Sequence, residues 1–87
     1  MNPDKVLLRY LRHRPKITIR VEKDFVLIEG KNTALEMLGK VLIAQSKYDK
    51  DCGSQMSPKG AASKYFSKES THGIYIHRLP CLNKKKP

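Results

Sequence analysis

The alternation of apolar and polar residues between positions 17 and 22 constrains the fold more than any other feature of the chain. Ile17, Ile19 and Val21 occupy alternate positions, and the residues that follow each of them are polar. Because successive side chains of a strand point to opposite faces, this pattern predicts a half-buried β-strand. A polar turn at 22–24 leads into the apolar run 25–28, which predicts a second and more fully buried strand. Together the two segments predict a β-hairpin.

A change from strand spacing to helical spacing follows Gly30. The residues of segment 33–48 that share one helical face are Leu35, Leu38, Val41, Leu42 and Gln45, with Lys40 and Lys47 on the other side. This arrangement is typical of an amphipathic helix. Thr33 and Glu36 have the spacing of a capping box. Gly39 costs a helix up to about 1 kcal/mol relative to alanine, which close packing of the helix on a sheet would explain.

The flanking segments are less regular. Residues 3–14 carry Val6, Leu7, Tyr10 and Leu11 at helical spacing, so we predict a short amphipathic helix there, with a strand as the alternative. The composition of residues 49–63 predicts a long loop, which in a small domain is often functional or mobile. We expect a brief strand or turn at 64–67 and a final strand at 73–79, ended by Pro80.

These elements predict a single α+β domain over residues 1–82, followed by a basic disordered tail at 83–87. The expected architecture is a three- or four-stranded, mainly antiparallel sheet with one main helix packed on one face. The opposite face of the sheet would present Thr18, Arg20, Tyr75 and His77 to solvent or to a partner.

The strong positive charge of the chain bears on its partners. Lys and Arg number 18 against 8 Asp and Glu, for a formal net charge of +10 in 87 residues. A field of this sign favours nucleic acid, an anionic membrane or an acidic protein surface, although charge of one sign also serves solubility alone.

No segment has the length of a membrane span or the pattern of a signal peptide, so we expect no membrane partner and a cytoplasmic location. In that compartment Cys52 and Cys81 are expected to be reduced, with a disulfide between them as the alternative. The sequence does not indicate an oligomeric state.

Many of the cations lie in one N-terminal stretch. The candidate nucleic-acid-binding residues are Lys5, Arg9, Tyr10, Arg12, Arg14, Lys16 and Arg20. Several cations on one surface are what contact with phosphates requires, and a tyrosine among them would stack on a base. No helix-turn-helix, zinc-finger or RNA-recognition signature accompanies them, so a solvated charged face is the alternative.

The histidines offer an option for catalysis. His72 and His77, with Arg78 beside them, would provide the acid, the base and the phosphate-binding cation of a small ribonuclease. Residues 71–75 are similar to a segment of small HicA-type messenger-RNA interferases, although the order of elements around them differs. Isolated histidines without a fixed orienting partner rarely catalyse, so we predict no enzyme and no catalytic residue.

Metal binding has little support from the sequence. Cys52, Cys81, His72 and His77 lack the paired spacing of a zinc site. The start of a calcium loop around Asp49 and Asp51 is incomplete. We therefore predict no metal and no cofactor.

The order of elements resembles a known class of proteins. A strand ending in Val-Leu-Ile-Glu-Gly runs into Asn-Thr-Ala-Leu-Glu-Met-Leu-Gly-Lys-Val-Leu, and after a polar loop the chain closes with Gly-Ile-Tyr-Ile-His-Arg-Leu-Pro. Over about residues 17–80 this is similar to small immunity proteins of bacterial polymorphic-toxin systems. The resemblance implies a non-enzymatic protein that neutralises a toxin by covering its active site. The charge of this chain would then require an acidic toxin face.

We accordingly predict a small basic non-enzymatic binding module, immunity-like or inhibitory, that contacts a protein partner through the 49–63 loop and one sheet face. A nucleic-acid-binding protein is the alternative, and a small ribonuclease is the third hypothesis.

Overall fold

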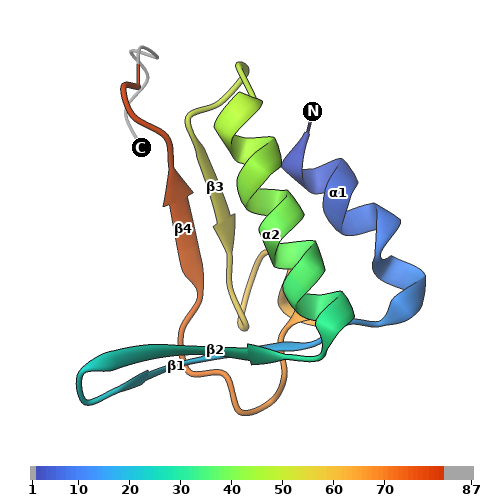
Figure 1. The fold of residues 1–87 in the computed structure, drawn as a ribbon, viewed down its shortest axis with the longest axis vertical. Helices are drawn as coiled ribbons and strands as arrows, with labels where there is room; N and C mark the ends of the chain where they lie inside the picture. Colours follow the sequence, from blue (N-terminus) through green and yellow to red (C-terminus); the bar gives the residue numbers. More distant parts are fainter. Residues whose placement is uncertain (1, 82–87) are drawn as a thin grey trace.

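The computed structural model describes residues 2–81, which form an α+β fold, as the sequence predicts (Figure 1). It contains two α-helices and two antiparallel sheets of two strands each. The elements in chain order are α1 (Pro3–Arg9), a 3-10 turn (Leu11–His13), β1 (Ile17–Glu22), β2 (Phe25–Gly30), α2 (Asn32–Lys47), β3 (Gly53–Met56), a second 3-10 turn (Ser63–Tyr65) and β4 (Ile74–His77). The predicted tail at 83–87 lies outside the described residues.

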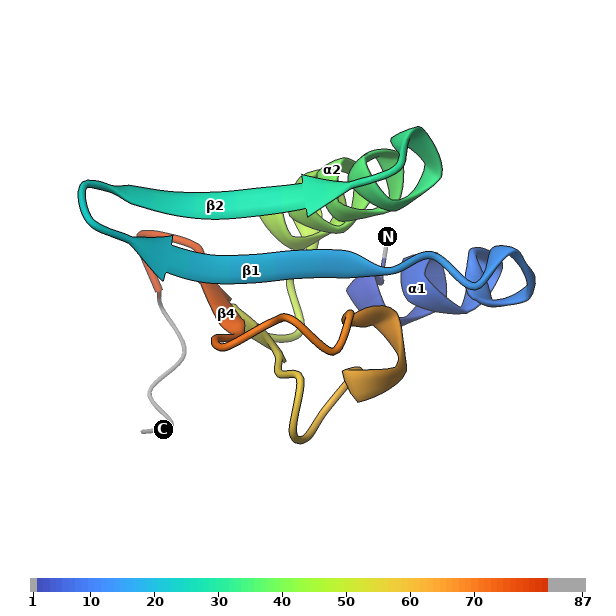
Figure 2. The same ribbon diagram turned by 90° about the horizontal axis from the view of Figure 1, so that it is seen from below.

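The first sheet is the predicted hairpin. β1 and β2 pair antiparallel, with Ile19 opposite Ile28 and a turn in which Lys23 has a φ of 34°. The other edge of β1 is occupied by the segment 66–72, whose backbone at Ser67 and Thr71 donates to the carbonyls of Ile17 and Ile19. Figure 2 shows β1 lying between β2 and this segment. Because the edge of β1 is taken, β4 does not join the hairpin.

The second sheet corrects two predictions. β3 lies within 49–63, where the sequence predicts only a loop, and it pairs antiparallel with β4 from Gly53 opposite His77 to Met56 opposite Ile74. The single three- or four-stranded sheet is therefore wrong, because the strands form two separate pairs. The final strand at 73–79 is confirmed as β4, and the turn at 64–67 as the 3-10 turn before Phe66.

Helix α2 is confirmed, but the face it buries is not the predicted one. Its buried residues are Ala34, Met37, Leu38, Val41, Ala44 and Gln45, whereas Leu35 and Leu42 are exposed. Helix α1 packs against α2, so α2 turns its small alanines and Met37 toward the interior. Nothing lies within 4 Å of a Cβ placed on Gly39, so the expected close packing of the sheet against this position is wrong.

The predicted capping box is also wrong. The N-cap of α2 is Lys31, and no side chain caps it. The carboxylate of Glu36 instead accepts a hydrogen bond of 2.9 Å from the Tyr10 hydroxyl and pairs with Lys40 at 3.3 Å. Glu36 therefore ties α2 to the end of α1 rather than to its own first turn.

The N-terminal segment is helical, and the alternative of a strand is wrong. Asn2 caps α1 by accepting from the backbone of Asp4, and Val6 and Leu7 are buried in the core. The core also includes the buried Tyr65, whose hydroxyl donates to the Leu7 carbonyl at 2.9 Å. Burial raises the pKa of Tyr65 above its usual value, so the neutral phenol is the form that the fold favours.

Candidate functional site

One face of the hairpin continues past the core. Ile17 and Ile19 on this face are 0% and 1% exposed. Their neighbours on the same face toward the turn are Ile28, Val21 and Val26, which are 44%, 56% and 61% exposed. Figure 1 shows the hairpin turn projecting past β4, away from the helices. We name Val21, Val26 and Ile28 the hairpin overhang.

The exposure of β2 contradicts the prediction that it is the more fully buried strand. Its burial pattern shows no buried residue, and Phe25 at the turn is 74% exposed. The alternation rule places Val26 and Ile28 on the core-side face, but the core ends before it reaches them. A run of apolar residues therefore indicates a strand here without indicating that other residues of the chain cover it.

A second group of exposed apolar residues lies on α2. Leu35, Leu42 and Ile43 are exposed, and Gly39 lies on the same side of the helix by helical spacing. Figure 2 shows α2 and β2 on the same side of the molecule. Contiguous exposed apolar surface of this kind is typical of interaction sites in soluble proteins.

The structure brings three of the predicted nucleic-acid-binding residues together. Arg12, Arg14 and Lys16 line a hollow of about 390 Å³ with Lys64, and Lys16 donates to the Lys64 carbonyl at 2.7 Å. Arg14 and Lys16 also line a neighbouring hollow of about 460 Å³ beside Lys31 and the first turn of α2. We name Arg12, Arg14, Lys16, Lys31 and Lys64 the basic cluster. Lys31 and Lys64 were not among the sequence candidates, because both lie far from the N-terminal stretch in the chain.

The other four sequence candidates lie outside the basic cluster. Arg20 forms an ion pair of 3.0 Å with Glu22 on the hairpin, and Lys5 lies exposed on α1. Arg9, also on α1, lies with Arg12 beside a separate hollow. Tyr10 is hydrogen-bonded to Glu36 and packs against the core, so its ring is not free to stack on a base.

The Tyr10–Glu36 contact has an electrostatic consequence. The hydrogen bond from Tyr10 is the main cause that lowers the pKa of Glu36 below its ordinary value. The hydrogen bond from Lys40 and its positive charge lower this pKa further. Glu36 correspondingly raises the pKa of Lys40. Both groups therefore stay charged at neutral pH.

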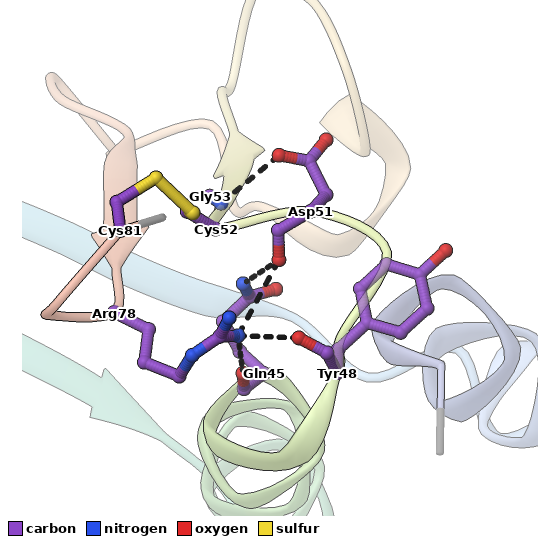
Figure 3. The surroundings of a disulfide bond; sticks show 7 residues. All are labelled: Gln45, Tyr48, Asp51, Cys52, Gly53, Arg78 and Cys81. Atoms are coloured by element: carbon purple, nitrogen blue, oxygen red, sulfur yellow. Dashed lines mark hydrogen bonds between the residues drawn. A yellow bond between two sulfur atoms is a disulfide. The ribbon is translucent and has the colours of Figure 1, made fainter. Parts of the chain in front are cut away.

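A disulfide and a half-buried hydrogen-bond network around Arg78 lie at the turn between α2 and β3 (Figure 3). Cys52 and Cys81 are bonded, with Cα atoms 5.6 Å apart, so the expectation of reduced thiols differs from the structure. The Arg78 guanidinium donates to the carbonyls of Gln45 and Tyr48 at the end of α2, where helix carbonyls lack intrahelical partners. The sequence carried one weak signal for this site, the presence of two cysteines.

Apart from Arg20, the residues expected on an open sheet face are Thr18, Tyr75 and His77, and they have different environments. Thr18 is buried, and its hydroxyl lies 2.5 Å from that of Ser67, because the segment 66–72 covers this side of β1. Tyr75 and His77 are exposed on β4 with their rings stacked 5.9 Å apart. His72 lies outside β4, and its Nδ1 is 2.7 Å from the Thr71 hydroxyl.

Comparisons with known proteins add no assignment. No protein-family model matches the chain, and no curated protein or solved structure matches it either. Within residues 2–81, no helix has the length and apolar character needed to cross a membrane.

Proposed function

We propose that the protein is a non-enzymatic binding module whose partner is another protein, held on the hairpin overhang. The supporting observation is that Val21, Val26 and Ile28 are exposed on the same hairpin face as the buried Ile17 and Ile19. Full burial of a Val or Ile side chain contributes about 1.5 to 3 kcal/mol. A partner that completes this face would therefore gain binding energy from side chains that are already held in place by the hairpin.

The charge of the whole chain, rather than that of the hairpin, indicates the character of the partner. The hairpin carries Arg20 and Lys23 against Glu22, Asp24 and Glu29, so it is nearly neutral, whereas the chain has a net charge of +10. A partner with an apolar contact surface and a net negative charge fits the overhang and would be drawn to the chain by long-range attraction. We therefore keep an immunity-like or inhibitory role, with a single cognate protein as the target, as the form of this proposal. The 49–63 segment, predicted from the sequence to form part of the contact, includes β3 of the second sheet and is not included in this proposed interface.

The test uses proteins encoded next to the gene for this chain as partners. Each is co-purified with the chain, and the stoichiometry and Kd of any complex are measured by light scattering and calorimetry. Val26→Asp should weaken the complex by at least about a hundredfold, because it places an unpaired charge in an apolar interface. Leu8→Asp on α1 is the matched control, since Leu8 is 63% exposed and lies away from the hairpin. A complex that tolerates Val26→Asp as well as Leu8→Asp would refute this interface.

A second candidate function, nucleic-acid binding, is supported by the basic cluster. Five cations from three separate segments line two adjoining hollows, with Glu29 as the acidic residue among the lining positions. Phosphate groups are the anions that such a cluster accommodates, and each contact releases counterions.

Titration of labelled single- and double-stranded DNA and RNA at several salt concentrations tests this second candidate. Replacing Arg12 and Arg14 by Gln should reduce the slope of log K against log salt by about one unit for each arginine that binds a phosphate. Arg20→Gln is the control, because Arg20 is paired with Glu22 outside the cluster. The Val26→Asp variant should bind nucleic acid as the wild type does, so the two candidate functions are separable on the same set of proteins.

A further inference from the structure

Two cysteines and a histidine meet at one end of the second sheet. Cys52 immediately precedes β3, His77 ends β4 and Cys81 follows the turn after it. Each side chain offers one ligand atom, and the three atoms lie within 4.8 Å of one another. The pairing of Gly53 with His77 brings the two strand ends together across a sequence separation of 29 residues between the cysteines. The chain spacing alone did not indicate this cluster.

Contacts that do not involve sulfur hold the same arrangement. The backbone of Arg78, the neighbour of His77, donates to the Cys52 carbonyl at 2.8 Å. Figure 3 shows its guanidinium reaching the carbonyls at the end of α2. The strand ends are therefore tied together by hydrogen bonds as well as by the disulfide, and breaking the sulfur–sulfur bond leaves those ties in place.

The distances suit a metal ion bound by two thiolates. Zinc binds cysteine sulfur at about 2.3 Å, which in tetrahedral geometry separates two sulfur ligands by about 3.8 Å. Cα atoms 5.6 Å apart allow that separation after rotation about the Cα–Cβ bonds. Two thiolates and an imidazole form a ligand set that suits zinc.

The surroundings of the cluster favour an open coordination position. Cys52 is buried and Cys81 is half-buried, while His77 is exposed and its ring is stacked against Tyr75. Three protein ligands leave the fourth position of a tetrahedral ion free, and the exposed side of the cluster gives water or a group from a partner access to it.

We propose that the reduced protein binds one zinc ion through Cys52, His77 and Cys81, and that disulfide formation abolishes the site. A dithiol reductant transfers two electrons and two protons to the Cys52–Cys81 bond, which yields two thiols and the cyclic disulfide of the reductant. Zinc then displaces both thiol protons into solvent and is bound by the two thiolates and the neutral ring of His77. Metal binding and the disulfide are mutually exclusive, so the redox state of the surroundings selects between them.

The test is a cobalt titration of the reduced protein under anaerobic conditions, followed by competition with zinc. A phosphine reductant is used, because it is converted to its oxide and leaves no competing thiol. We expect saturation at one equivalent, with the charge-transfer absorption of a cobalt–thiolate bond that zinc then removes. The oxidised protein should show no such absorption.

His77→Ala is the deciding variant. His77 is exposed, so the oxidised variant should keep the wild-type circular dichroism spectrum, which is recorded as the check on folding. Loss of an outer-sphere partner alone lowers metal affinity by about 10- to 100-fold, so removal of a ligand should lower it by at least about tenfold. His72→Ala is the matched control, since His72 is exposed and lies outside the cluster.

Three results would each overturn the proposal. One is the absence of charge-transfer absorption in the reduced wild type, and another is equal absorption in the oxidised protein. The third is binding by His77→Ala that is as tight as that of the wild type, which would mean that the thiols bind metal without a built site.

Discussion

The two sheets of this protein have the same antiparallel pairing but are held in order in different ways. β1 and β2 are built mainly from Ile, Val, Leu and Phe, which favour extended backbone. β3 reads Gly-Ser-Gln-Met and has no β-branched residue, yet it pairs with β4 along all four of its positions. A disulfide and the Arg78 hydrogen bonds hold the end of this pair. The difference shows that a strand can be specified by its own residues or by the contacts at its ends.

The two sheets also differ in the side chains that they expose. The first sheet has more apolar residues than the core covers, and the surplus forms the hairpin overhang. In the second sheet Met56 is buried and Ile74 and Ile76 are half-buried against the core, and the chemically active side chains lie at the tethered end. The proposed protein interface and the proposed metal site thus follow from how each sheet is ordered.

The largest expected effect comes from a comparison of Ile19 with Ile28, its cross-strand partner in the first sheet. Ile19→Ala should destabilise the protein by about 4 kcal/mol, because it leaves a cavity in the core. Ile28→Ala should cost about 1 kcal/mol, since Ile28 is already half exposed. Urea unfolding of both variants measures the two values. Equal destabilisation would show that Ile28 is covered in solution and would remove the overhang as a free surface.

Loss of the disulfide should destabilise the second sheet more than the first. Replacing Cys52 and Cys81 by Ser should lower the free energy of unfolding by about 3 kcal/mol, because the bond closes a loop across 29 residues of sequence separation. Hydrogen exchange, measured with a metal chelator present, should show reduced protection in β3 and β4 and retained protection in β1 and β2. A uniform decrease across both sheets would mean that the first sheet also depends on the tether.

Gly53 in β3 and Gly73, which immediately precedes β4, should respond differently to alanine. A Cβ on Gly73 would meet the backbone oxygen of Met56 and lie 2.8 Å from the Cα of Ser57, neither of which moves without shifting β3. Gly73→Ala should therefore cost about 2 kcal/mol. The three atoms nearest to a Cβ on Gly53 all belong to the Tyr75 side chain, which is exposed and can rotate away, so Gly53→Ala should cost less than about 0.5 kcal/mol. Thermal unfolding compares them, and similar destabilisation would indicate that Tyr75 is held rigidly.

The last prediction concerns α2, which packs against elements of both sheets. Gly39→Ala should stabilise the protein by about 1 kcal/mol, because alanine favours the helix and its Cβ meets no neighbour. Protection from hydrogen exchange should rise in both sheets alike. A destabilised variant would instead reveal a neighbour at Gly39 in solution, such as a second copy of the chain.

Local pattern was sufficient for the elements whose own residues favour them. Alternation at Ile17, Ile19 and Val21 predicted β1, and the helical spacing of apolar residues predicted both α1 and α2. The buried face of α2 was predicted wrongly because Leu35 and Leu42 are larger apolar residues than Ala34 and Ala44. The size of a side chain does not indicate which side of the helix a second helix will cover. The capping box failed because Tyr10, distant in the chain, competes for Glu36.

The candidate sites also depend partly on composition and partly on the fold. The excess of cations is visible in the composition, but the basic cluster joins Arg14 and Lys16 to Lys31 and Lys64 only through folding. The pairing of Cys52 with Cys81 and the approach of His77 depend on a strand that the sequence does not indicate.

The sequence by itself determined the α+β class, the hairpin, the main helix and the positive charge, because these depend on the spacing and type of neighbouring residues. Only the tertiary structure decided that the strands form two sheets, that the hairpin extends beyond the core, and that two cysteines and a histidine lie close together. The physical reason is that each of these depends on which distant segment occupies a strand edge or a helix face. The segment 66–72 takes the edge of β1, which leaves β4 to order β3.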